Sequence, residues 1–170
     1  IDSQDDDFAW YDMAVGQRAT KLAYIIRPAI EEDEDVKDIA AHIETAELHI
    51  RELMEEEKIA MHSNHGLFQM AGLLALGESL PFLSLSNEAS KIAIRKNRTM
   101  LEDHFTEDYL HKEHSPMYHI FIANYVSLLL DSDFMAESIE FTHHAESAIE
   151  AAKWFAIPNQ NILPYGDTPK

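Results

Sequence analysis

Two polar residues at a predicted helix start have the chemistry to hold a carboxylate. In the segment SNHGLFQMAGLLALG, Ser63 or Asn64 can cap the helix, and Asn64 and His65 lie beside its unpaired backbone N–H groups. A helix N-terminus carries partial positive charge and free donors, so an anion bound there gains charge-assisted hydrogen bonds. Taken alone, the same residues also fit a plain helix cap and a partly exposed polar side chain.

A second predicted helix start places a phenol where it can transfer a proton. In the segment EHSPMYHIFIANY the Ser-Pro order is the one favoured at helix starts, so Tyr118 falls in the first turn. The positive end of a helix favours negative charge, which would help a phenol to exchange a proton. His114 and His119 flank the tyrosine, and Glu113 could orient one of them. An aromatic residue at this spacing also fits a core position.

Apolar residues recur at helical spacing nearly everywhere, and no segment alternates strictly enough to be a strand. The sequence therefore predicts an all-α fold. Apolar stripes and helix breakers such as Pro28 and Pro81 set approximate helix bounds. The six predicted helices are Phe8–Arg27, Val36–Ile59, Asn64–Leu80, Asn87–Phe105, Pro116–Asp131 and Phe134–Phe155.

Short connections between these helices imply antiparallel neighbours, either as a bundle or as stacked hairpins. If successive helices alternate in direction, the first, third and fifth all start at one end of the domain. That arrangement would bring Asn64 and Tyr118 within reach of one ligand. We expect a single domain over residues 1–157, and a linker over residues 158–170, where proline and glycine are frequent.

Composition excludes several classes of function. The formal net charge is −18, and the main basic cluster, Lys91 to Arg98, has no interleaved aromatic residues to stack on bases, so we predict no nucleic-acid binding. The longest apolar runs, near Leu73 and Val126, fall far short of the roughly 20 residues that a membrane span needs. The absence of cysteine rules out disulfides and thiolate chemistry.

Metal catalysis and glycoside hydrolysis are also disfavoured. The string from His111 to His114 is one residue short of the His-x-x-Glu-His zinc pattern, and the chain has a single Glu-x-x-His where a di-iron site needs two. We therefore predict no metal site and no cofactor. No carboxylate pair stands out as the two acids of a glycosidase. The rival to an enzyme is a non-catalytic helical scaffold or carbohydrate-binding module.

Four motifs together resemble the heparinase II/III family of polysaccharide lyases and related alginate lyases. In that family a helical toroid is followed by a β-rich domain. The resemblance implies that this chain forms antiparallel hairpins of an incomplete (α/α) toroid, that the β-rich domain lies outside it, and that the protein is bacterial and periplasmic or secreted. The motifs are WYDMAVGQR from Trp10 to Arg18, SNHGLFQMAGLLALGESLP from Ser63 to Pro81, FTEDYLHKEHSPMYH from Phe105 to His119, and the closing LPYGDT.

The resemblance also implies an activity, the β-elimination of uronic-acid polysaccharides of heparinoid, alginate or capsular type. In the family, the Asn of the Asn-His-Gly stretch neutralises the uronate carboxylate, a role that carries over to Asn64, with His65 assisting. The Tyr of the Ser-Pro-x-Tyr-His stretch is the proton donor, which here is Tyr118. One departure is visible, because Asp108-Tyr109 stands where family members often have Asp-Gly.

An anionic polysaccharide is therefore the expected partner of this chain. Several residues close to the two helix starts are further candidates for contacts with the sugar. Trp10 fits a packing role as well. The predicted substrate-binding residues are Trp10, Arg18, Gln69, Glu113, His114 and His119.

Overall fold

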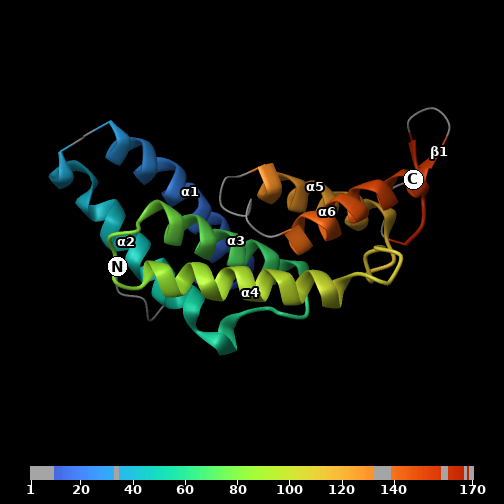
Figure 1. Cartoon of the computed structure of the whole chain (residues 1–170), viewed down its shortest axis with the longest axis horizontal. Helices are drawn as coiled ribbons and strands as arrows, with labels where there is room; N and C mark the ends of the chain where they lie inside the picture. Colours follow the sequence, from blue (N-terminus) through green and yellow to red (C-terminus); the bar gives the residue numbers. More distant parts are fainter. Residues whose placement is uncertain (1–9, 33–34, 132–138, 158–160, 167, 169–170) are drawn as a thin grey trace. The chain divides into compact units, whose positions relative to one another are not determined.

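The structure is a computed structural model, which describes residues 10–32, 35–131, 139–157, 161–166 and 168 (Figure 1). The prediction of an all-α fold is confirmed. Among the described helices, none combines the length and apolar character of a membrane span. The elements are α1 (Asp12–Glu31), α2 (Val36–Met54), η1 (Glu56–Lys58), α3 (Asn64–Ser79), α4 (Ser86–His104), α5 (Pro116–Asp131), α6 (Ile139–Ala151), η2 (Ala152–Phe155), β1 (Ala156–Ile157) and β2 (Asn161–Ile162).

The predicted ends of the first two helices are wrong, each for a local reason. Pro28 does not end α1, although it lacks the N–H that would donate inside the helix, because its fixed φ is compatible with the helical backbone. The helix continues to Glu31, and the N–H of Glu32 donates to the Pro28 carbonyl oxygen at 2.9 Å. α2 ends at Met54 instead of near Ile59, since the backbone at the next residue turns to an extended conformation.

The C-terminal part departs from the prediction in two further ways. After Ala151 the chain tightens into the 3-10 turn η2 and does not stay α-helical to Phe155. Residues 156–157 then pair with residues 161–162 as the short antiparallel strands β1 and β2. Periodicity cannot detect strands of two residues, because they contain no alternation. The predicted helix starts near Phe8 and Phe134 lie outside the described residues.

Contacts within the chain group into two compact units, and the division falls inside α4, between Asn97 and Arg98. In the first unit α1 packs along α3, and α2 contacts both helices. α3 is buried along nearly its whole length. An apolar surface on every side is expected of a helix at the centre of a helical assembly, and α3 has that place in the first unit (Figure 1).

The contact between α1 and α3 depends on two glycines. A Cβ atom added to Gly16 would lie 2.3 Å from the carbonyl oxygen of Phe68, and one added to Gly72 would lie 2.2 Å from the carbonyl oxygen of Gly16. Backbone atoms cannot move aside as a flexible side chain can. The two helices therefore approach this closely because neither glycine carries a side chain.

Histidines take part in the core of the second unit. His119 is buried, its Nδ1 accepts from the His111 N–H at 3.1 Å, and its Nε2 lies 2.9 Å from the Ala148 carbonyl oxygen, to which it donates. The Phe105 ring packs edge-on against His111, His119 and His144. Burial, reinforced by the neighbouring histidines, lowers the pKa of His111 to about 4, and burial also lowers the pKa values of His119 and His144. No three His, Asp or Glu side chains within the described ranges are grouped as metal ligands.

We expect Gly72→Ala to lower the free energy of unfolding by about 3 kcal/mol, near the top of the usual range for overpacking, because the new methyl group meets backbone. Urea denaturation measures the change. Gln17→Ala, on the exposed side of α1, is the matched control and should change stability by less than about 0.5 kcal/mol. Equal effects of the two substitutions would contradict a tight helix crossing.

Acid should weaken the second unit. The unfolded chain protonates His111 below a pH of about 6.5, whereas the folded unit resists this protonation until the pH approaches about 4. The unfolded state therefore binds more protons in this window, and the free energy of unfolding falls as the pH decreases through it. Urea titrations across the window measure this slope, which His111→Asn should reduce. A slope that the substitution leaves unchanged would show that other groups, such as His119 and His144, set the acid sensitivity and this histidine does not.

Candidate functional site

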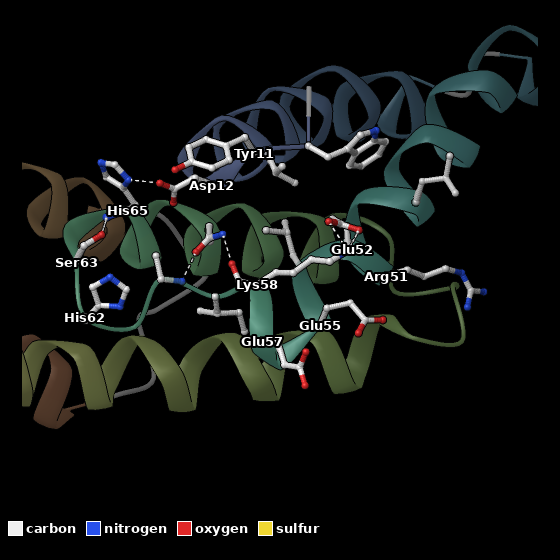
Figure 2. A pocket seen from close by; sticks show the side chains of 17 residues that line it. Tyr11, Asp12, Arg51, Glu52, Glu55, Glu57, Lys58, His62, Ser63 and His65 are labelled. Atoms are coloured by element: carbon white, nitrogen blue, oxygen red, sulfur yellow. Dashed lines mark hydrogen bonds and ion pairs between the residues drawn. The ribbon is translucent and has the colours of Figure 1, made fainter. Parts of the chain in front are cut away.

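A groove of about 1210 Å³ opens on the first unit (Figure 2). Residues 10–12 line it, together with the last turn of α2 and the loop that leads into α3. The volume exceeds the roughly 300–1,000 Å³ of pockets for small compact ligands. An open groove of this size suits an extended ligand such as a chain of sugars.

Asn64 is the first residue of α3, and it is not the helix cap. Ser63 takes that role, because its extended backbone precedes the helix and its Oγ accepts from the His65 N–H at 3.1 Å. The Asn64 side chain is buried, yet within the described part of the chain it makes no hydrogen bond. An amide with both donor and acceptor unused therefore lies at the positive end of this helix.

His65 pairs with an acid from the start of α1. Its Nδ1 lies 2.5 Å from Oδ2 of Asp12, and 42% of the His65 side chain is exposed against 19% for Asp12. Both side chains line the groove, and Figure 2 shows the imidazole ring beside the carboxylate. The second ring nitrogen, Nε2, has no hydrogen-bond partner among the described residues. The groove therefore contains an oriented histidine with one nitrogen available.

Gln69 shapes the loop that borders the groove. Its Oε1 accepts from the Ala60 N–H at 2.8 Å, and its Nε2 donates to the Lys58 carbonyl oxygen at 2.9 Å. The Lys58 side chain is held in turn by Glu52, with 2.7 Å between Nζ and Oε1. Both ends of the Gln69 amide are thus engaged by backbone, and its predicted contact with the sugar stays a prediction.

Trp10 and Arg18, two further predicted sugar contacts, lie next to each other. The Arg18 guanidinium lies 5.8 Å from the centre of the Trp10 ring, and its Nε–H donates to Nε2 of His49 at 3.4 Å. His49 Nδ1 donates to the Thr45 carbonyl oxygen at 2.8 Å, and burial, together with Arg18, lowers the pKa of His49. Trp10 therefore packs as predicted and lines the groove as well.

Both ends of the groove contain carboxylates. In the view of Figure 2, Glu55 and Glu57 lie near Arg51 and Lys58, whereas Asp12 lies beside His65 near the start of α3. Formal charge alone therefore does not separate the two ends. The N-terminus of α3, with its partial positive charge, is the feature that favours an anion at that end.

Tyr118 lies in the first turn of α5, in the second unit, with 36% of its surface exposed. Its hydroxyl group makes no hydrogen bond to the described residues. Thr168, far along the sequence, caps the start of α5. Its hydroxyl group accepts from the Met117 N–H at 3.1 Å and lies 3.3 Å from Oγ of Ser115. Thr168 is buried, although it belongs to the segment predicted to be a linker.

The other predicted residues near Tyr118 have distinct surroundings. His119 has no nitrogen free for a ligand, because backbone groups occupy both. His114 is exposed and has a left-handed backbone, with φ of 55°. The predicted pairing of Glu113 with a flanking histidine is not found, since the exposed Glu113 carboxylate has no partner within the described chain.

The departure of Tyr109 from the expected glycine has a structural consequence. Its φ is 60°, a region that glycine enters freely and side chains seldom adopt. The Tyr109 ring packs edge-on against His144, with 5.1 Å between ring centres, and lies 6.0 Å from His143. A glycine at this position would adopt the left-handed backbone without strain. We infer that the ring contacts of Tyr109 offset the strain that its side chain causes.

Sequence reasoning missed two residues that act at these helix starts, Asp12 and Thr168. Both stand within motifs that carried the family resemblance, Asp12 in WYDMAVGQR and Thr168 in LPYGDT. Each acts on a residue more than fifty positions away, so no local pattern shows its partner. Their position inside these motifs was the one sign in the sequence that Asp12 and Thr168 have a role.

We expect Thr168→Val to lower the free energy of unfolding by about 1 kcal/mol, the usual effect of removing a helix cap, because valine keeps the shape but cannot accept from the Met117 N–H. Urea denaturation measures the loss, and Thr168→Ser should restore most of it. Thr106 is another loop threonine, but its hydroxyl accepts from the Leu110 N–H, so it is unsuitable as a neutral control. Wild-type stability in the valine variant would show that the cap is unimportant.

Comparison with known proteins places the chain in a family. The family model described as heparinase II/III N-terminus matches residues 1–169, and this match confirms the resemblance that the four motifs indicated. No curated protein and no solved structure matches the chain. The chain therefore belongs to the heparinase II/III N-terminal family and is a polysaccharide lyase-related domain.

Proposed function

We propose that this chain is the helical, substrate-binding part of a lyase that cleaves uronic-acid polysaccharides by β-elimination. One observation carries the proposal, the Asn64 amide, which makes no hydrogen bond to the described residues and stands at a helix start that Ser63 already caps. A ligand carboxylate would accept a hydrogen bond from the Asn64 side-chain amide at the positive end of this helix.

The chemistry of β-elimination explains why an amide is needed there. A base removes the proton on the carbon next to the uronate carboxylate, and the electron pair of that C–H bond forms a carbon–carbon double bond. The neighbouring C–O bond breaks, and the departing oxygen takes a proton. Negative charge builds up on the carboxylate during this step, so hydrogen bonds from Asn64 and the α3 N-terminus strengthen as the reaction proceeds.

Tyr118 is proposed as the acid that protonates the departing oxygen. Its place in the first turn of α5 and its unpaired hydroxyl group suit proton transfer. It can serve as both base and acid if the proton and the departing oxygen lie on one face of the sugar. The roles of Asn64, in the first unit, and Tyr118, in the second, are each proposed from the resemblance and from the place of each residue at a helix start.

The carboxylates of the groove set a limit on the substrate. Glu55 and Glu57 are exposed, so a polymer with a charge on every sugar would meet repulsion if it filled the whole groove. We propose that the uronate carboxylate lies at the α3 end, beside His65, which lines the groove. Asn64 stands at the same helix start but is not among the residues that line the groove. The end with Glu55 and Glu57 would then face a neutral part of the sugar chain or solvent.

The test uses the full-length protein with heparan-like, alginate and capsular uronans. Eliminative cleavage creates a conjugated double bond, so we expect ultraviolet absorbance to rise with at least one polymer. Tyr118→Phe should lower the rate by at least about 100-fold, because a positioned acid contributes on the order of 10²–10⁴. Binding of the polymer, measured by calorimetry, should change little, since the aromatic ring remains and only its hydroxyl group is removed.

The matched control is Tyr24→Phe, which removes a hydroxyl group from an exposed tyrosine on α1 and should leave the rate unchanged. Binding of a uronan without any rise in absorbance would overturn the lyase proposal in favour of a non-catalytic carbohydrate-binding module. Cleavage at the wild-type rate by Tyr118→Phe would show that another group is the acid.

A further inference from the structure

Asp12 has three features that ordinary helix stability does not explain. It is not glycine, yet its φ is 49°. Its Oδ1 is buried without a hydrogen-bond partner among the described residues. Its other oxygen, Oδ2, lies 2.5 Å from Nδ1 of His65, and both residues line the groove. A left-handed backbone and an unpaired buried oxygen are both unfavourable, and such features persist where the surrounding structure imposes them.

The pairing determines which nitrogen of His65 holds a proton. An ionised carboxylate accepts hydrogen bonds but cannot donate one, so Oδ2 of Asp12 requires a hydrogen on Nδ1. In the neutral ring, Nε2 is then the nitrogen that can take up a proton. In the protonated ring, Nδ1–H stays with Asp12 and Nε2–H is left for a ligand. In both states Nε2 is the atom that is offered outward.

We propose that Asp12 is a positioning residue, which holds the His65 ring so that Nε2 is the atom presented to the uronate carboxylate. This inference rests on the proposed function of the groove. Asp12 itself does not touch the sugar, because one oxygen is engaged by His65 and the other is buried. The His65 side chain is 42% exposed, so its Nε2 is accessible to a ligand while its Nδ1 is held.

A purely structural role for Asp12 makes a different prediction. An acid in the first turn of a helix interacts favourably with the helix dipole whether or not a histidine is near. Glu88 stands in the first turn of α4 and is exposed, which makes it the matched control. If Asp12 acted through the dipole alone, Asp12→Asn and Glu88→Gln would have similar small effects on stability and none on the state of His65.

The first experiment reads the His65 tautomer by NMR, with ¹⁵N-labelled histidine in the full-length protein and His65→Gln to assign the signal. We expect the wild-type ring to show a proton on Nδ1 in its neutral form. Asp12→Asn should lose this pattern, because the new amide can donate to Nδ1, and asparagine tolerates the left-handed backbone. Glu88→Gln should leave the signal as it is. A wild-type ring protonated on Nε2 alone, or a signal insensitive to Asp12→Asn, would overturn the proposal.

The second experiment measures cleavage of the uronan that wild type degrades best. We expect Asp12→Asn to lower kcat on the order of 10- to 100-fold with KM changed much less, because the lost contact matters most as charge develops. In the His65→Gln background, Asp12→Asn should have almost no further effect. Independent, multiplying effects of the two substitutions would overturn a role that acts through His65.

The two proposals fail separately. If wild type cleaves no uronan, the lyase proposal falls, and the NMR spectrum still decides whether Asp12 sets the tautomer of His65. If wild type cleaves while the spectrum or the double substitution shows no coupling, the lyase proposal stands and the role of Asp12 is wrong. Circular dichroism of each variant confirms that a loss of rate does not come from unfolding.

Discussion

The close crossing of α1 and α3 is the constraint on which the first unit depends. Gly16 and Gly72 let the two backbones meet directly, so neither helix can slide or rotate without a clash. The starts of the helices are thereby placed within one hydrogen bond of each other, which joins Asp12 to His65. Two buried glycines therefore help to set the shape of the groove, because they hold α1 against α3.

The spacing of apolar residues predicted the helices correctly where one face or the whole of a helix is buried. The bounds of α5 agree with the prediction, and each differing end of α3 and α4 is displaced by one residue, because serine or proline marks the starts of these helices and Pro81 follows α3. The prediction that the first helix ends at Pro28 was wrong, because α1 continues past this proline to Glu31. The strands β1 and β2 could not be predicted, because strands of two residues depend on tertiary contacts.

The places of Asn64 at the start of α3 and of Tyr118 in the first turn of α5 were predicted from the sequence, since caps and first turns follow local rules. Ser63 and Asn64 are neighbours that can both cap a helix, so local rules could not show that Ser63 alone caps α3. Nor could they show that the Asn64 amide makes no hydrogen bond to the described residues. They also could not show that Asp12 reaches His65, since that contact depends on how two separate helices pack. His119 has the residue type of a ligand contact, but its hydrogen bonds place it in the core.

The hydroxyl group of Thr168 gives the second unit an unusual vulnerability. A protease that cut the backbone shortly after β2 would remove no residue of α5 and break no covalent bond near it. It would nevertheless detach the group that accepts from the Met117 N–H, and the first turn would be left to fray. Tyr118 lies in that turn, so a cut far along the sequence would disorder its phenol although no residue of α5 had been removed.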